Sequence, residues 1–437
     1  MAAGGMSLIE RFAALSDPRQ VAKVLHPLPE VLLPLLCATL SGADDFVEAE
    51  LWGEENLAFL RRFLPFTRGI PSHDVSGDLV ARLDPALFRD CFTAWVAGLR
   101  AADPDLAGPE VVAIDGKTSR RSHARSKGRE PLHLLSAWAN SQRLVLGQEA
   151  AADKSNEIAA IPLLLERLDL AGALVTIDAM GTQRAVAEAV QARGGDYLLA
   201  LKGNRPATHA EVAASFADPL PGAPVRTHRT TDGEHGRVEV RRHAVCHDVG
   251  WLFSDRRYPD EPSFPGLAMI GMVESETERG GKVERERRYY LGSARLDAET
   301  FARAARAHWG VENRLHWTLD VVFRDDLARL RTGHGPENMA VVRHMALNLL
   351  SQAKPTTSLK NRRKRAGWNT DYLERLIRGT ARRSHPIALL PRSLPGASAR
   401  GDVAAEPRRS TPVSASGRAR SARRPAFRRP RWPAPRP

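Results

Sequence analysis

The sequence lacks a hydrophobic run long enough to cross a membrane. The longest apolar run near the amino terminus, Val31 to Leu40, is interrupted by Pro34 and has about half the length that a membrane-spanning helix needs. Residues 1–17 contain charged positions such as Glu10 and Asp17 and lack an apolar segment followed by a small-residue cleavage site, which is the pattern of a secretory signal. We therefore expect a cytoplasmic protein that makes no contact with a membrane.

Cysteine is also scarce. The chain has three, Cys37, Cys91 and Cys246, and their spacing forms neither a disulfide framework nor a CxxC metal-binding pair. We expect all three to act as small apolar side chains in the core.

Most of the protein has little excess charge, although the net charge of the whole chain is +13. The segment from Ser384 onward contains twelve Arg, no Lys and two acids, and so contributes +10. The other 383 residues hold 52 basic and 49 acidic groups, so net charge alone is weak evidence for nucleic-acid binding. The segment is rich in Arg, Pro and Ser and has no apolar periodicity, which predicts disorder. It is either a functional basic arm or the product of an altered reading frame or read-through.

The apolar pattern changes several times along the 437 residues, which are enough for two or three domains. Residues 21–101 have helical periodicity, and the region after residue 106 alternates strands with helices, as in an α/β sheet with parallel members. We predict a helical amino-terminal domain (1–105), the first part of an α/β core (106–205), a β-rich insertion (206–297), the final core helices (298–383) and a disordered tail (384–437).

Three carboxylates are placed where a site is expected. Asp115 and Asp178 each follow an apolar strand directly, at the edge of an α/β sheet where binding sites gather, although each alone could simply cap a turn. Glu312 lies on the apolar stripe of a later helix, three residues before Leu315 and seven before Leu319, which predicts that it points inward. A buried carboxylate without a partner costs several kcal/mol. Three converging carboxylates therefore predict two Mg²⁺ or Mn²⁺ ions, which prefer oxygen ligands.

The sequence around these carboxylates resembles the ISAs1-type insertion-sequence transposases, a branch of the DDE transposases that includes H-repeat-associated proteins. The helical front of the chain also matches, through PSHDV (71–75) and LDPALFRDCFTAWV (83–96). The matching core segments are AIDGKTSRRSH (113–123), LHLLSAWAN (132–140), KSNEIAAIPLLL (154–165), TIDAMGTQ (176–183), GGDYLLALKGN (194–204), DGEHGRVEVR (232–241), RRYYLGS (287–293) and HWGVENRLHWTLDVVFRDD (308–326).

The resemblance implies a ribonuclease-H-like core in which Asp115, Asp178 and Glu312 are the catalytic residues and metal ligands. It also implies binding to double-stranded DNA, namely the inverted repeats of the element and the target. We expect the helical domain (1–105) to recognise the DNA ends, and a homodimer associated with the nucleoid to bind them. A wider pattern in related families places Tyr, Arg and Lys around the glutamate, where this sequence has Ala305, His308 and Leu319.

Several residues near the carboxylates are candidate DNA contacts, and each also has a plainer reading as a solvated or packed side chain. They are Lys117, Arg120, Arg121, Lys202, His308, Asn313 and His316.

Two other functions fit the same sequence. One is a catalytically silent, repeat-associated relative that binds DNA, and the other is a stand-alone nuclease of the same fold.

Overall fold

The computed structural model describes most of the chain before residue 380. The described residues are 6–101, 110–123, 128, 130–151, 156–219, 221–234, 237–253, 264–279, 282–353 and 357–379. The chain divides into two units, Met1–Ser384 and His385–Pro437, and the predicted tail lies outside the described residues. None of the described helices is long and apolar enough to cross a membrane.

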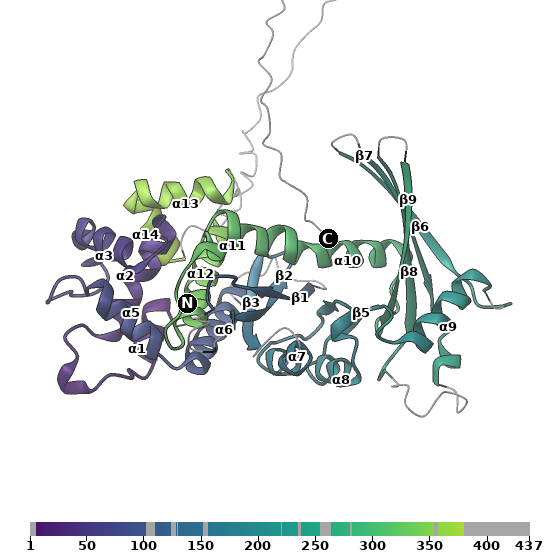
Figure 1. Cartoon of the computed structure of the whole chain (residues 1–437), viewed down its shortest axis with the longest axis horizontal. Helices are drawn as coiled ribbons and strands as arrows, with labels where there is room; N and C mark the ends of the chain where they lie inside the picture. The colour runs from purple at the N-terminus through teal and green to yellow at the C-terminus, as the bar shows by residue number, and fades with distance from the viewer. Residues whose placement is uncertain are drawn as a thin grey trace, which may run out of the picture. The chain divides into compact units, whose positions relative to one another are not determined.

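The predicted α/β architecture is confirmed as one mixed sheet of nine strands in the order β3-β2-β1-β4-β5-β9-β8-β7-β6 (Figure 1). Strands β1, β4 and β5 are parallel to one another. Strand β2 pairs antiparallel with β1, and β3 pairs antiparallel with β2 at the edge of the sheet. The strands of this first half are β1 (Val111–Thr118), β2 (His133–Ala139), β3 (Leu144–Ala151), β4 (Leu174–Ile177) and β5 (Asp196–Leu201).

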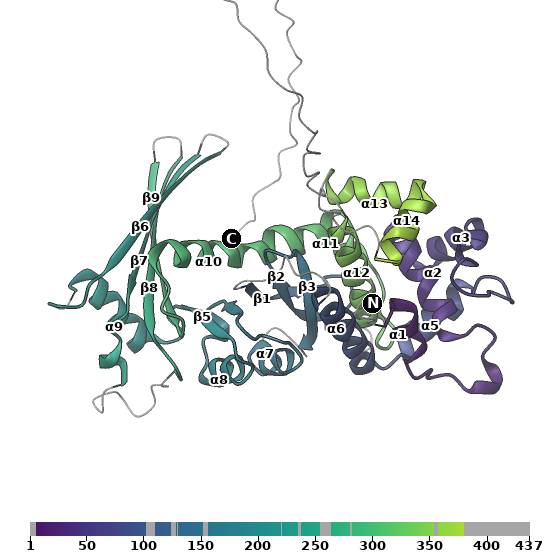
Figure 2. The ribbon, with the colours of Figure 1, turned by 180° about the vertical axis from the view of Figure 1, so that it is seen from behind.

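The predicted β-rich segment continues this sheet. Strand β9 pairs with β5 through Leu198 and Gly292, and the remaining strands follow as an antiparallel ladder. The ends of these strands extend past the rest of the sheet in both views (Figures 1 and 2). We call β6–β9 the arm: β6 (Arg226–Glu234), β7 (Arg237–Cys246), β8 (Met269–Arg279) and β9 (Lys282–Gly292), preceded by α9 (Pro206–Ala217).

The chain before the sheet is helical, as predicted. Helix α5 begins where the sequence offers an N-cap, because Ser72 Oγ accepts a hydrogen bond of 3.3 Å from Val75 N. The elements are α1 (Leu8–Ala13), a 3₁₀ turn (Val21–Lys23), α2 (Leu28–Ser41), α3 (Phe46–Glu55), α4 (Leu57–Leu60), α5 (His73–Arg82) and α6 (Pro85–Ala101).

Helix α12 (Gly335–Gln352) joins these helices to the sheet. Asn338 Nδ2 donates to the carbonyls of Val80 and Leu83 at 2.8 and 2.9 Å, and Asn348 exchanges two hydrogen bonds with the backbone of Val145 in β3. The amino-terminal helices and the first half of the sheet therefore share one apolar core. The predicted boundaries between separate domains remain a prediction.

Further helices lie on both sides of the sheet. In both views α7 and α8 lie on one side and α10 on the other (Figures 1 and 2). Their bounds are α7 (Glu157–Glu166), α8 (Arg184–Ala192), α10 (Ala298–Gly310), α11 (Trp317–Val321), α13 (Leu359–Trp368) and α14 (Thr370–Ile377), with 3₁₀ turns at Ala179–Gly181, Gly250–Phe253 and Asp325–Leu327.

Candidate active site

Two of the predicted carboxylates lie side by side at one edge of the sheet. Strands β1 and β4 are parallel neighbours with Ile114 opposite Ile177, so Asp115 and Asp178 occupy the next position on each. Asp178 also caps a 3₁₀ turn by accepting a hydrogen bond of 3.1 Å from Met180 N. The turn-capping reading therefore holds for Asp178, and it leaves further carboxylate lone pairs for another ligand.

The helix that carries Glu312 crosses these two strands. His308 Nδ1 lies 3.1 Å from Thr176 Oγ1 of β4, and His316 Nδ1 lies 3.6 Å from Asp115 Oδ2 of β1. Because Glu312 lies midway between the two histidines in the sequence, the helix holds it above the strand ends that carry the two aspartates.

The prediction that Glu312 points inward is wrong. Its side chain is exposed, whereas Val311 and Leu315 are buried. Residues Val311–His316 form a π-helical turn, in which the wider i→i+5 spacing changes which side chains share the buried face. Such turns occur as short interruptions of α-helices, frequently at functional sites. The carboxylate therefore lies beside the apolar stripe and remains accessible.

Burial and neighbouring carboxylates raise the pKa of Asp115. Burial, followed by the nearby carboxylates of Glu312, Asp178 and Glu157, raises the pKa of Asp115 to about 7. His316 does not neutralise this charge, because burial lowers its pKa to about 4 and leaves the ring uncharged at neutral pH. Among the described residues, no Lys or Arg forms an ion pair with the three predicted ligands. The site is thus a group of oxygens without a counter-ion.

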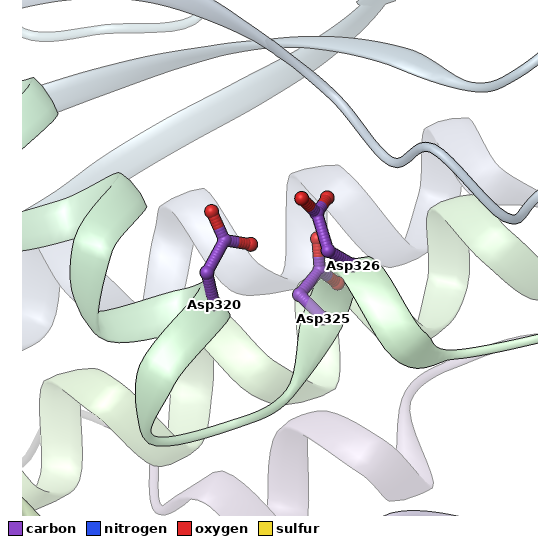
Figure 3. Close-up of side chains that lie close together, drawn as sticks. All are labelled: Asp320, Asp325 and Asp326. Carbon is purple, nitrogen blue, oxygen red and sulfur yellow. The ribbon is translucent and has the colours of Figure 1, made fainter. Parts of the chain in front are cut away.

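A second acidic cluster lies farther along the same segment and is neutralised differently. The carboxylates of Asp320, Asp325 and Asp326 approach one another (Figure 3), but Lys117 Nζ lies 2.8, 3.0 and 3.1 Å from one oxygen of each. Burial opposes the charge on Lys117, but Asp325 and Asp320 raise its pKa to about 12. We call this group the Lys117 cluster.

Two more residues complete the Lys117 cluster. Arg343 Nη1 lies 2.8 Å from Asp325 Oδ1, and Ser119 Oγ donates to Asp325 Oδ2 at 3.0 Å. Together with Arg120, whose Nε lies near Asp326, three cations thus face three carboxylates, so the cluster does not need a metal ion to be stable. Lys117, a candidate DNA contact, joins β1 to α11 and to the segment after it.

A buried acid–base pair beside Asp115 escaped the sequence reasoning. His133 Nε2 lies 2.5 Å from Glu157 Oε1, and Thr118 Oγ1 lies 2.8 Å from His133 Nδ1. A Cβ on Gly116 would lie 2.5 Å from His133 Nε2, so glycine permits this close packing. The sequence did offer one signal for this pair, namely an acid, Glu157, at the start of α7. In the structure this end of α7 lies next to Gly116 of β1.

The other predicted site residues lie at different depths. His308 is largely buried, and burial lowers its pKa, which the charge of Asp178 opposes. Arg120 Nε lies 3.3 Å from Asp326 Oδ2 with its side chain 81% exposed. The remaining three, Arg121, Lys202 and Asn313, are exposed.

The donor set suits a divalent metal. Carboxylate oxygens are the preferred protein ligands of Mg²⁺ and Mn²⁺, and Asp115, Asp178 and Glu312 offer such oxygens without a Lys or Arg partner in the described part of the chain. Their ligand atoms are more widely spaced than those of the Lys117 cluster. The Lys117 cluster contrasts with them, because an ammonium group already lies among its oxygens.

Comparison with known proteins identifies the family to which the chain is similar. The family described as "Transposase DDE domain" matches residues 106–349, and the family described as "DDE_Tnp_1-associated" matches residues 9–96. The chain is 37% identical over 383 residues to the "H repeat-associated putative transposase YhhI" of Escherichia coli (strain K12), covering 85% of this chain and 98% of that protein.

Two further relatives show the range of the similarity. An uncharacterised protein in the dhlA 3′ region of Xanthobacter autotrophicus is 41% identical over 287 residues, covering 65% of this chain and 94% of that protein. The "Inactive transposase YbfQ" of Escherichia coli (strain K12) is 39% identical over 75 residues, covering 17% of this chain and 89% of that protein.

Proposed function

We propose that this chain, which belongs to the DDE transposases of the ISAs1 and H-repeat kind, excises its own mobile element and joins the element to target DNA. In this proposal the first half of the sheet is a ribonuclease-H-like core, and the ligands of two Mg²⁺ or Mn²⁺ ions are Asp115, Asp178 and Glu312. The observation that supports it best is the group of three carboxylates that no described Lys or Arg neutralises.

The parts of the site have distinct tasks in this proposal. When bound between carboxylates, two such ions activate a water or a 3′-hydroxyl and stabilise the leaving oxygen of a phosphodiester. The neighbouring strands fix Asp115 and Asp178, and the π-helical turn presents Glu312 from above. The contacts of His308 with β4 and of His316 with β1 hold that turn in place.

The substrate in this proposal is double-stranded DNA carrying the inverted repeats of the element, bound by a homodimer. Phosphate contacts position a protein on DNA and base contacts select the sequence. The exposed Arg121, Lys202 and Asn313 remain candidates for phosphate contacts. The Lys117 interactions favour a structural role for that residue instead.

The test is Mg²⁺-dependent cleavage of a labelled duplex that carries the terminal repeat. We expect Asp115→Asn, Asp178→Asn and Glu312→Gln each to reduce the cleavage rate by at least 10³-fold, on the order of the loss of a principal catalytic group, while end binding remains. Glu299→Gln is the matched control, because Glu299 lies on α10 and, among the described residues, pairs with the exposed Arg303 at 3.0 Å.

The outcomes separate the three functions. Cleavage by any one ligand variant at near the parental rate would remove that residue from the site. A parental chain that binds repeats without cutting them would indicate the silent relative. Cleavage without joining of the product to target DNA would indicate a stand-alone nuclease.

A further inference from the structure

Helix α13 divides its positive charges between two opposite faces. Its sequence, LKNRRKRAGW, contains five cations and no acid. Arg362 and Arg363 are buried, whereas Lys360, Lys364 and Arg365 are exposed. The helix therefore uses its cations in two ways.

The buried pair is structural. Arg363 donates to the carbonyls of Thr39 and Ala43 at 2.9 and 3.0 Å, and Arg362 donates to the carbonyl of Leu350 at 2.5 Å. These bonds fix the orientation of α13 and leave its other face toward solvent.

That other face has no carboxylate partner in the described part of the chain. Lys360, Lys364 and Trp368 follow one another at four-residue spacing, so they form a single ridge on the helix. Trp368 is 79% exposed. The nearest acids of α14, Asp371 and Glu374, already pair with Arg62. We call Lys360, Lys364, Arg365 and Trp368 the α13 ridge.

The α13 ridge is attached to the helix that carries the proposed site. Arg363 Nη1 donates to the carbonyl of Val322, directly after α11, and its guanidinium stacks on Phe323 at 4.8 Å. Val322 follows Glu312 by ten residues, which is about 15 Å of helix. Duplex DNA lying on Glu312 is long enough to reach the α13 ridge as well.

We propose that the α13 ridge binds the phosphate backbone of the duplex whose end enters the site, an inference that rests on the proposed function. Lys360 and Lys364 contact phosphates without reading sequence, and the indole of Trp368 adds an uncharged contact with sugars or base edges. Lys360 and Lys364, which have no carboxylate partner among the described residues, provide the positive charge that a polyanion attracts, whereas Arg365 stacks on the ring of Tyr372 at 4.6 Å. The exposed indole beside them provides contact area without charge.

The test is a salt titration of binding to a fluorescein-labelled duplex of mixed sequence. We expect Lys360→Gln with Lys364→Gln to lower the magnitude of the log–log salt slope by about 1.8, because each neutralised phosphate contributes about 0.9. Trp368→Ala should weaken binding several-fold with the slope unchanged. The charge-matched control is Arg184→Gln with Arg295→Gln, which removes two exposed cations outside α13 and should leave the slope parental.

Circular dichroism and thermal unfolding establish that each variant is folded. A parental slope in the double lysine variant, or an equal loss in the control, would overturn the inference while the cleavage results stand. A parental affinity in the Trp368 variant would remove the indole from the surface. A parental chain that does not bind duplex DNA at any salt concentration would instead contradict the proposed function.

Discussion

At the scale of single residues, one cation distinguishes two acidic groups that lie near each other in the sequence. Asp320, Asp325 and Asp326 surround Lys117, whereas Asp115, Asp178 and Glu312 have no such partner among the described residues. The carboxylates of the Lys117 cluster lie closer together than the other three, but cations already balance them. The other three carboxylates have no described Lys or Arg partner, which is why we propose them as the metal ligands.

We expect Lys117→Met to lower the free energy of unfolding by about 3–5 kcal/mol, the cost of removing one partner from a buried ion pair. The side chain of Lys117 is only 12% exposed, so water cannot replace the ammonium group. Lys202→Met, at an exposed position, should stay within about 0.5 kcal/mol of the parent. Urea unfolding measures both. Equal stability of the two variants would return Lys117 to the candidate DNA contacts.

The sequence was sufficient to place Asp115 and Asp178 at the edge of the sheet, because each directly follows an apolar strand and the two strands are parallel neighbours. It was insufficient for Lys117, whose partners lie more than two hundred residues away. It also failed for the burial of Glu312, since regular α-helical spacing contains no sign of a π-helical turn.

At the scale of elements, α10 must fit closely against the arm for its far end to reach the site. A Cβ at Gly271 of β8 would lie 2.6 Å from the ring of Phe301 near the start of α10. The helix begins there because the side chain of Asp297 accepts a hydrogen bond of 2.7 Å from Thr300 N. Glycine in β8 thus sets how closely α10 approaches the sheet.

Gly271→Ala should therefore lower stability by about 1–3 kcal/mol, the usual cost of overpacking, and slow cleavage by moving the Glu312 turn. The matched substitution is Gly233→Ala in β6, where an added Cβ meets nothing within 4 Å. Thermal unfolding and cleavage assays compare the two. If the Gly271 variant had the stability and cleavage rate of the parent, the start of α10 would be able to shift without disturbing the site.

For the arm, the sequence predicted the strands but not how they pair with the rest of the sheet. Alternating β-type segments predicted a β-rich region between residues 206 and 297, and strands β6–β9 confirm it. The pairing of β9 with β5 could not be predicted, because the contact joins residues almost a hundred positions apart and leaves no periodic signal in either strand.

At the scale of the whole molecule, the amino-terminal helices and the sheet are held together by α12. His344 of this helix is fully buried, with Nδ1 2.7 Å from Gln148 Oε1 of β3. Deleting the first hundred residues would expose the apolar face of α12, so the contribution of the amino-terminal helices to DNA recognition is better tested by surface substitutions.

Burial lowers the pKa of His344 to about 3, which makes the shared core sensitive to acid. The unfolded chain binds the proton near pH 6.5 and the folded chain does not, so the stability that this residue contributes is present above about pH 6.5 and is lost as the pH falls toward 3. In the parent, the free energy of unfolding should fall by up to about 1.4 kcal/mol per pH unit over this range because of His344. We expect His344→Gln to abolish this part of the pH dependence. Urea unfolding from neutral pH to about pH 4 measures it, and parallel curves for parent and variant would show that His344 takes up a proton while folded.

The unbroken ladder from β6 to β1 also has a mechanical consequence. A sheet whose neighbouring strands are all hydrogen-bonded has no hinge between the arm and the strands that carry Asp115 and Asp178. A force on the arm is therefore transmitted from β9 to β5, and from β5 to β4, which ends beside Asp178. The arm is a rigid lever, and a load on it acts on the spacing of the two aspartates.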